Sequence, residues 1–111
     1  MRTAERRENG TMREKLKATI NSRQLAILEG IAYRIADIYY MRARYGDEAK
    51  HEINDSHNCL MLLFADADRE KIPFFVQNTV ICYFENFKNY HMTDVSTYLE
   101  HHENYDITLV R

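Results

Sequence analysis

With 111 residues, of which 45% are hydrophobic and 29% charged, the chain has the size of one domain and is too apolar to be intrinsically disordered. Its three glycines and single proline are few for this length, which argues against a turn-rich β sandwich or barrel and favours long helices. It holds no apolar run of the roughly 18 residues that span a bilayer, and no apolar stretch follows the N-terminal arginines as in a signal peptide. These features predict a soluble, cytoplasmic, all-α domain with no membrane partner.

Charge is distributed unevenly along the chain, although the formal net charge is only −2. Residues 1–24 contain seven basic and three acidic side chains, whereas residues 47–72 contain seven acidic and three basic ones. Residues 85–111 are also acidic, with five acidic and two basic side chains. The chain is therefore basic first and acidic later, which makes its N-terminal part the segment suited to phosphate groups.

The polar residues 1–10 end at Gly10 and are predicted to form a disordered arm, which leaves residues 11–111 as a single helical domain. Thr11 and Glu14 form a capping-box pattern, in which each side chain satisfies a free amide at a helix start. A helix is therefore expected to begin near Thr11. Apolar residues three, four or seven apart then follow one stripe of a 3.6-residue period: Leu16, Ile20, Ile27, Ile31, Ile35 and Ile38.

Asn21 and Ser22 interrupt this stripe and leave two alternatives for the first helical region. Either one long helix runs to Tyr45, or Ser22 caps a second helix that covers about residues 23–45. The break is favoured, because Asn and Ser side chains compete with the hydrogen bonds of a helix.

An αα-hairpin is predicted around Gly46, which can take the left-handed conformation that ends a helix. The adjacent Asp47 can cap the helix that follows. Apolar residues recur at helical spacing over residues 47–70, although the turn-forming residues between 54 and 58 disfavour a helix in its first half.

Pro73 marks the next boundary, because proline suits the first turn of a helix and pushes Ile72 before it toward an extended conformation. Residues 74–87 are apolar nearly all round, which predicts either a central buried helix or a helix completed by a partner. Thr93 and Asp94 then start a short helix.

The C-terminal residues 107–110 are predicted to form a short extended tail. Taken together, the pattern predicts a small bundle of about four helices. Its breaks are expected near Asn21, Gly46, Ile72 and Met92, where capping and turn residues separate the periodic stretches.

The sequence contains no combination of residues that predicts an active site or a metal centre. Glu48 and His51 have the spacing of ligands in carboxylate-bridged metal bundles, but the second pair that such a site needs is missing. Cys59 and Cys82 lie in apolar stretches and are expected to be buried, reduced thiols without nucleophilic activation. The chain is therefore expected to have no catalytic residues, no metal and no cofactor, and not to be an enzyme.

Eight tyrosines are the feature that a small core accommodates least easily. Tyrosine buries a large ring while it keeps a polar hydroxyl, so protein interfaces are enriched in it, although half-buried tyrosines at a core edge are an equal alternative. The preferred function is a non-catalytic protein–protein interaction domain that acts as an inhibitor or adaptor of a larger complex, as a phage or mobile element would encode. A homodimer is compatible with this interpretation. The candidate protein-binding residues are Tyr40, Tyr90, Tyr98, Glu100, Glu103 and Tyr105.

A nucleic-acid-associated regulator is the alternative function, with the basic N-terminal segment gripping phosphates through counterion release. The acidic charge after residue 46 opposes it, because those carboxylates would repel a phosphate backbone. The candidate residues for this alternative are Arg2, Arg6, Arg7, Arg13, Lys15 and Lys17.

Overall fold

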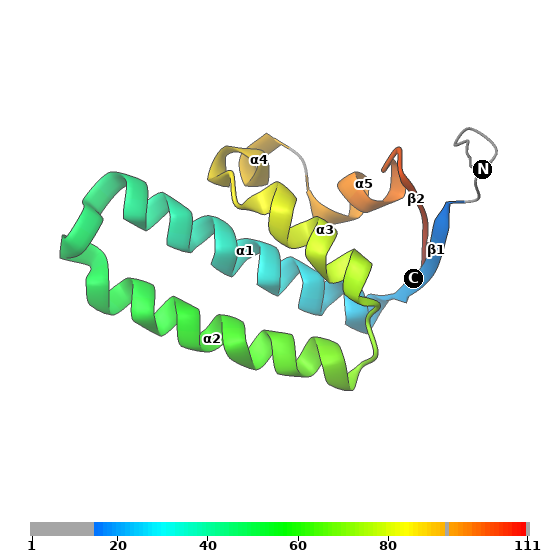
Figure 1. The fold of residues 1–111 in the computed structure, drawn as a ribbon, viewed down its shortest axis with the longest axis horizontal. Helices are drawn as coiled ribbons and strands as arrows, with labels where there is room; N and C mark the ends of the chain where they lie inside the picture. Colours follow the sequence, from blue (N-terminus) through cyan, green and yellow to red (C-terminus); the bar gives the residue numbers. More distant parts are fainter. Residues whose placement is uncertain (1–14, 93, 111) are drawn as a thin grey trace, which may run out of the picture.

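The computed structural model describes residues 15–92 and 94–110, with the side chains of residues 90–92 left out. The predicted arm at residues 1–10 and the capping box of Thr11 and Glu14 lie outside the described residues. The elements in chain order (Figure 1) are β1 (Leu16–Asn21), α1 (Ser22–Tyr45), the 3-10 helix η1 (Gly46–Ala49), α2 (Lys50–Arg69), α3 (Phe74–Phe84), α4 (Phe87–Met92), α5 (Val95–Glu100) and β2 (Tyr105–Val110).

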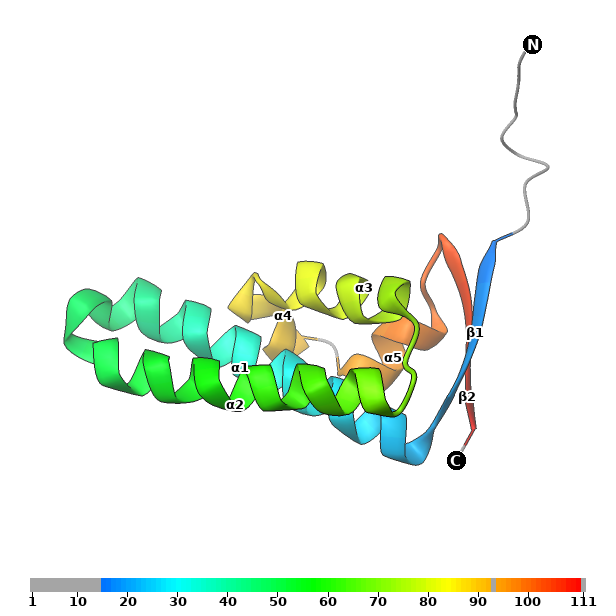
Figure 2. The same ribbon diagram turned by 60° about the horizontal axis from the view of Figure 1, so that its bottom comes forward.

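The fold is mostly helical and is organised around α1, which packs on α2, α3, α4 and α5. Helices α1 and α2 lie side by side along the length of the molecule, while α5 and the two strands occupy one end of it (Figures 1 and 2). The core consists of the inward faces of these elements, and its largest fully buried side chains include Phe84, Ile20, Leu28, Ile31 and Leu99. The predicted stripe is confirmed for α1, in which Ile31, Ile35 and Ile38 are buried.

The prediction of a helix over residues 16–20 is wrong, because these residues form β1. Leu16 and Ile20 are four residues apart, as on a helix face, but they also share one face of a strand because both are even-numbered. Strand β1 pairs in parallel with β2, from Leu16 opposite Tyr105 to Asn21 opposite Val110. The predicted extended tail is confirmed, and it begins two residues earlier than expected. If residues 16–20 continued α1 as a helix, β2 would lose the strand that it pairs with.

The predicted break at residues 21–22 is confirmed, although the capping residue is Asn21 and not Ser22. The Asn21 side chain accepts a hydrogen bond of 2.8 Å from the Gln24 amide, and the Gln24 side chain accepts one of 2.9 Å from the Asn21 amide. This reciprocal pair is a capping box, which satisfies two amides at the start of α1.

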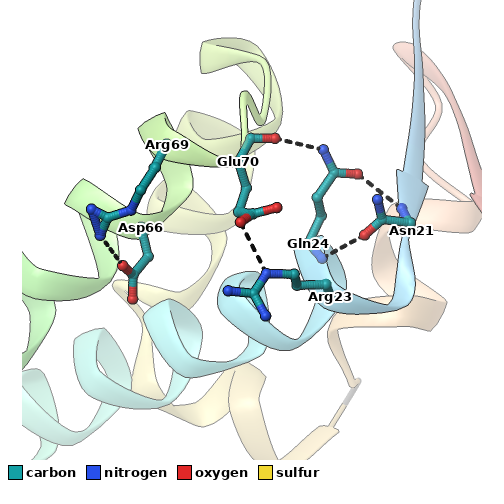
Figure 3. Close-up of polar contacts among 6 residues, drawn as sticks. All are labelled: Asn21, Arg23, Gln24, Asp66, Arg69 and Glu70. Carbon is teal, nitrogen blue, oxygen red and sulfur yellow. Dashed lines mark hydrogen bonds and ion pairs between the residues drawn. The ribbon is translucent and has the colours of Figure 1, made fainter.

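A hydrogen bond and an ion pair connect the start of α1 to the end of α2 (Figure 3). Gln24 Nε2 donates a hydrogen bond of 3.0 Å to the Glu70 carbonyl oxygen, and Arg23 Nε lies 2.9 Å from Glu70 Oε2. Beside them on α2, Arg69 pairs with Asp66. The cap at Asn21 therefore sits at a junction of three elements, where β1 turns into α1 and α1 meets α2.

We expect Asn21→Ala to lower the free energy of unfolding by about 1 kcal/mol, within the range of 0.5–2 kcal/mol typical for loss of an N-cap. Ser22→Ala is the matched control, because Ser22 is exposed and does not provide the cap. Urea denaturation followed by circular dichroism compares the two variants. Equal losses for both would show that Asn21 does not cap α1.

The packing of α1 on α2 depends on a close approach and on a polar cluster. A Cβ atom at Gly30 would lie 3.3 Å from the methyl carbons of Leu63, so glycine lets the two helices come together there. The buried Ser56 hydroxyl donates to Asp37 Oδ2 at 3.1 Å and accepts from Arg34 Nη1 at 3.4 Å. These hydrogen bonds satisfy a polar group that would otherwise destabilise the helix interface.

The connection between α1 and α2 differs in detail from the sequence pattern. Gly46 follows α1 with a φ of 59°, in the left-handed range, and its N–H bonds the Arg42 carbonyl oxygen. Asp47, predicted to cap the next helix, instead belongs to η1, and α2 starts after Ala49 without a side-chain cap. Helix α2 is continuous through the turn-forming residues 54–58, because packing on α1 outweighs their weak local preference.

The apolar stretch 74–87 is divided between two helices. Helix α3 ends at Phe84, and Glu85 and Asn86 separate it from α4. Pro73 directly precedes α3, as predicted, and Asp94 caps α5 by accepting a hydrogen bond of 2.7 Å from the Thr97 amide. Val76, Val80 and Phe84 are fully buried on the inner side of α3.

Candidate protein-binding site

An aromatic row connects α3, α5 and β2 at the end of the molecule that carries the sheet. The rings of Tyr83 and Tyr98 are stacked, with centroids 3.9 Å apart and planes 22° apart. The rings of His102 and Tyr105 are also stacked, at 4.7 Å and 30°. Tyr98 meets His102 edge-on at 5.3 Å, and Phe75 meets Tyr105 at 4.9 Å. Because such pairs stabilise beyond their buried area, the row fixes the position of α5 between α3 and β2.

A surface pocket of about 530 Å³ opens along this row. It is lined by Tyr83, Thr97 and Tyr98 together with residues 101–104. The lining contains the carboxylate of Glu103 and the imidazoles of His101 and His102, and none of the described residues that line it is a lysine or arginine. The site thus combines partly buried aromatic rings with an exposed carboxylate at its rim.

Burial raises the pKa of the Tyr98 hydroxyl above its ordinary value, because the phenolate would be less hydrated than it is in water. Smaller contributions come from Tyr83, Cys82 and Tyr105, whose ionised forms would repel a neighbouring phenolate. The hydroxyl therefore stays protonated at neutral pH, so that it can donate a hydrogen bond to a bound group.

Local hydrogen bonds orient the two histidines of the pocket. His102 Nδ1 accepts a hydrogen bond of 3.0 Å from the Asn104 amide, which leaves the proton of the neutral ring on Nε2. His101 Nδ1 lies 3.0 Å from the Thr97 carbonyl oxygen, one turn earlier on α5. Both rings are thus held by the end of α5 and the loop that follows it.

The structure brings together three of the six residues predicted to bind protein. Tyr98, Glu103 and Tyr105 belong to the pocket or to the aromatic row beside it. Glu100 is exposed at the end of α5. Tyr40 lies on α1, where its ring meets Tyr45 at 6.4 Å and Phe87 at 5.4 Å. Tyr90 belongs to α4, and its side chain is outside the described residues.

Five residues that line the pocket were not among the predicted protein-binding residues: Tyr83, Thr97, His101, His102 and Asn104. Tyr83 lies in the apolar stretch that was predicted as core, and its neighbour Phe84 is the fully buried residue. A tyrosine next to a buried phenylalanine on a helix points about 100° away from it, and this was the available signal.

The residues of the nucleic-acid alternative are only partly described. Lys15 and Lys17 are exposed, Lys17 in β1 and Lys15 just before it, whereas Arg2, Arg6, Arg7 and Arg13 lie outside the described residues. Lys17 stands in register with Asp106 of β2, so its charge has an acidic neighbour on the same face of the sheet.

Two other features of the described residues bear on the chemistry. No group of three or more His, Cys, Asp or Glu side chains in residues 15–92 and 94–110 is placed to hold a metal ion.

Both cysteines are free thiols, but the prediction that both are buried is wrong, because Cys82 is exposed and Cys59 is half-buried. Cys82 points away from the core because Val80 and Phe84 occupy the inner side of α3.

None of the helices in the described part of the chain combines the length and the apolar character that crossing a bilayer requires. Comparison with known proteins gives no match to the chain among family models, curated proteins or solved structures. What bears on function is therefore the geometry of the described residues themselves.

Proposed function

We propose that this chain is a non-catalytic interaction domain that binds a partner protein at the pocket beside the aromatic row, and so acts as an inhibitor or adaptor of a larger complex. The observation that carries the proposal is the juxtaposition of the two aromatic stacks with the exposed Glu103 around one open pocket. Rings with polar tips, already held in place, lose little conformational freedom on binding, which is why tyrosine is frequent at the centre of interfaces.

The charge of the pocket favours a basic segment of the partner. Glu103 supplies a carboxylate to the lining, and lysine and arginine are missing from the part of the lining that the structure describes. An arginine or lysine side chain could pair with this carboxylate while it lies against a tyrosine ring, an arrangement that combines ion pairing with a cation–π contact. The same charge would repel nucleic acid, which is why the protein partner is preferred.

We expect Glu103→Lys to weaken partner binding by roughly three- to thirty-fold, because the reversal replaces one attraction by one repulsion, each up to about 1 kcal/mol for exposed groups. Glu52→Lys is the matched control, since Glu52 is exposed near the start of α2, close to η1 and away from α5. Isothermal titration calorimetry with a partner captured from the source organism measures both variants. Equal weakening by both would show that the pocket is not the site.

Deletion of residues 1–10 separates this function from the nucleic-acid alternative. If the pocket binds protein, the deletion should change the affinity less than about twofold, because the deleted arm is polar in sequence and would contribute little desolvated area to a contact. If the chain binds nucleic acid, the deletion removes Arg2, Arg6 and Arg7, and the slope of log affinity against log salt should fall by up to about 3. Tight, steeply salt-dependent binding of the intact chain to nucleic acid would contradict the proposed function.

A further inference from the structure

The outer edge of β1 is one of the two edges of the sheet that have no neighbouring strand among the described residues. Among the described residues the sheet has two strands, β1 and β2, and it stands at one end of the molecule (Figures 1 and 2). Strand β2 packs on β1, α5 and α1, whereas β1 packs mainly on β2 and α1. A two-stranded sheet is marginal, and the free edge of its outer strand presents N–H and C=O groups in a row that fits another strand.

The side chains of β1 alternate between the two faces of the sheet. Ala18 and Ile20 face the helices, and Ile20 is fully buried. Leu16 shares this face at the start of the strand, but it is 57% exposed because the helices do not extend that far. Lys17 and Thr19 occupy the opposite, exposed face. Within the part of the chain that the structure describes, an apolar side chain thus lies exposed beside a strand edge without a neighbouring strand.

We propose that β1 pairs antiparallel with β1 of a second copy of this chain, about a twofold axis at Ala18, to give a continuous sheet of four strands in the order β2–β1–β1–β2. This inference concerns a surface other than the pocket, and its test is independent of the function proposed above.

A second copy fits this edge because the segment Leu16–Ile20 is complementary to itself when it is read in reverse. With Ala18 opposite Ala18, Leu16 lies opposite the partner subunit's Ile20, and Lys17 lies opposite the partner subunit's Thr19. Apolar residues meet apolar residues on the face of the helices, and polar residues meet polar residues on the other face. Ala18, which has the smallest side chain of the segment, lies at the axis, where its two copies are nearest to each other. An isologous contact requires a surface that is complementary to itself in this way.

The charges on the exposed face agree with the same register. Lys17 has Asp106 in register on its own β2 and would have a neutral threonine on the other side, so no like charges stand directly opposite each other. Pairing of the two strands in a shifted register is disfavoured, because Asn21 caps α1 and ends the strand.

The strand contact is small compared with the roughly 1,200–2,000 Å² of a standard stable interface. The dimer is therefore expected to be weak and to depend on protein concentration. Equilibrium sedimentation of the full chain over a wide concentration range should show a reversible monomer–dimer equilibrium.

Thr19 provides a test in which opposite charges give opposite results. In Thr19→Glu the carboxylate faces the partner subunit's Lys17 twice per dimer, and we expect the dissociation constant to fall by about 2- to 30-fold. In Thr19→Lys two lysines face each other, and we expect it to rise by a similar factor. Thr108→Lys is the matched control, because Thr108 is exposed on the same face of β2 and is in register with Thr19, one strand away from the new contact.

Leu16 provides a second, independent test. Leu16→Arg should abolish the dimer by placing a charged side chain from each subunit beside the strand contact, and it should leave the monomer folded because Leu16 is exposed there. Val110→Arg is its control, because Val110 is 51% exposed in β2. Dimerisation seen only in Thr19→Glu and lost on adding Leu16→Arg would support the same contact at lower affinity.

Two results would overturn the proposal. A chain that stays monomeric at every concentration, both as wild type and as Thr19→Glu, would show that the edge does not take a second copy. A dimer whose dissociation constant is unchanged by Thr19→Lys and by Leu16→Arg would show that the copies meet on another surface.

Discussion

Phe84→Ala should lower the free energy of unfolding by about 3–5 kcal/mol, the cost of removing a fully buried phenylalanine from a core. Phe84 is 0% exposed at the end of α3, and its ring meets those of Tyr83 at 5.0 Å and Tyr98 at 6.3 Å. The substitution therefore removes contacts within the core and also the support behind the aromatic row. Chemical denaturation monitored by circular dichroism gives the value.

Phe74→Ala is the control for this experiment, because Phe74 stands on the same helix but is 75% exposed. The same change in side chain should there cost less than about 1 kcal/mol. A loss at Phe84 as small as the loss at Phe74 would contradict the burial of Phe84 and the placement of α3 against α1.

Ile20→Ala should have the second largest effect, a loss of about 2–5 kcal/mol, as is usual for a buried isoleucine. Ile20 is 0% exposed on the inner face of β1, where it belongs to the same core as Phe84 and Leu99. Its partner in the sheet is Leu109 of β2, so the change also weakens the contact of the two strands with the helices.

Leu16→Ala is the matched control, measured at a concentration where the chain is monomeric. Leu16 lies on the same face of the same strand but is largely exposed, so its loss should cost less than about 0.5 kcal/mol. Losses of similar size at both positions would favour the helix that the sequence predicted for this segment, since that helix would place both side chains on one buried stripe.

The sequence predicted an element correctly where its hydrophobic repeat was long, and wrongly where the repeat was short. Ile31, Ile35 and Ile38 repeat at helical spacing along about two turns of α1, and such a repeat does not fit the period of a strand. Leu16 and Ile20 provide only one such step, which fits either structure. The choice between them is made by β2, which lies more than 80 residues later and cannot be seen in the local pattern.

The candidate site shows the same limit. Tyr98, Glu103 and Tyr105 were predicted because they lie close together in sequence at an acidic, tyrosine-rich end of the chain. Tyr83 comes from α3, and only the packing of α3 against α5 stacks it on Tyr98. Tyr40 is far from them in sequence, and it lies on α1 against Phe87.

The central claim, that the pocket beside the aromatic row is the surface that contacts a partner protein, is tested most directly by site-specific photo-crosslinking. A benzophenone amino acid is placed at Asn104, which is exposed and lines the pocket, and in a second variant at Asn54, which is exposed on α2 near the α1–α2 turn. After irradiation in an extract of the source organism, we expect a protein adduct of one defined mass from Asn104 and none from Asn54. Adducts of equal yield from both positions, or a nucleic-acid adduct in place of a protein, would contradict the claim.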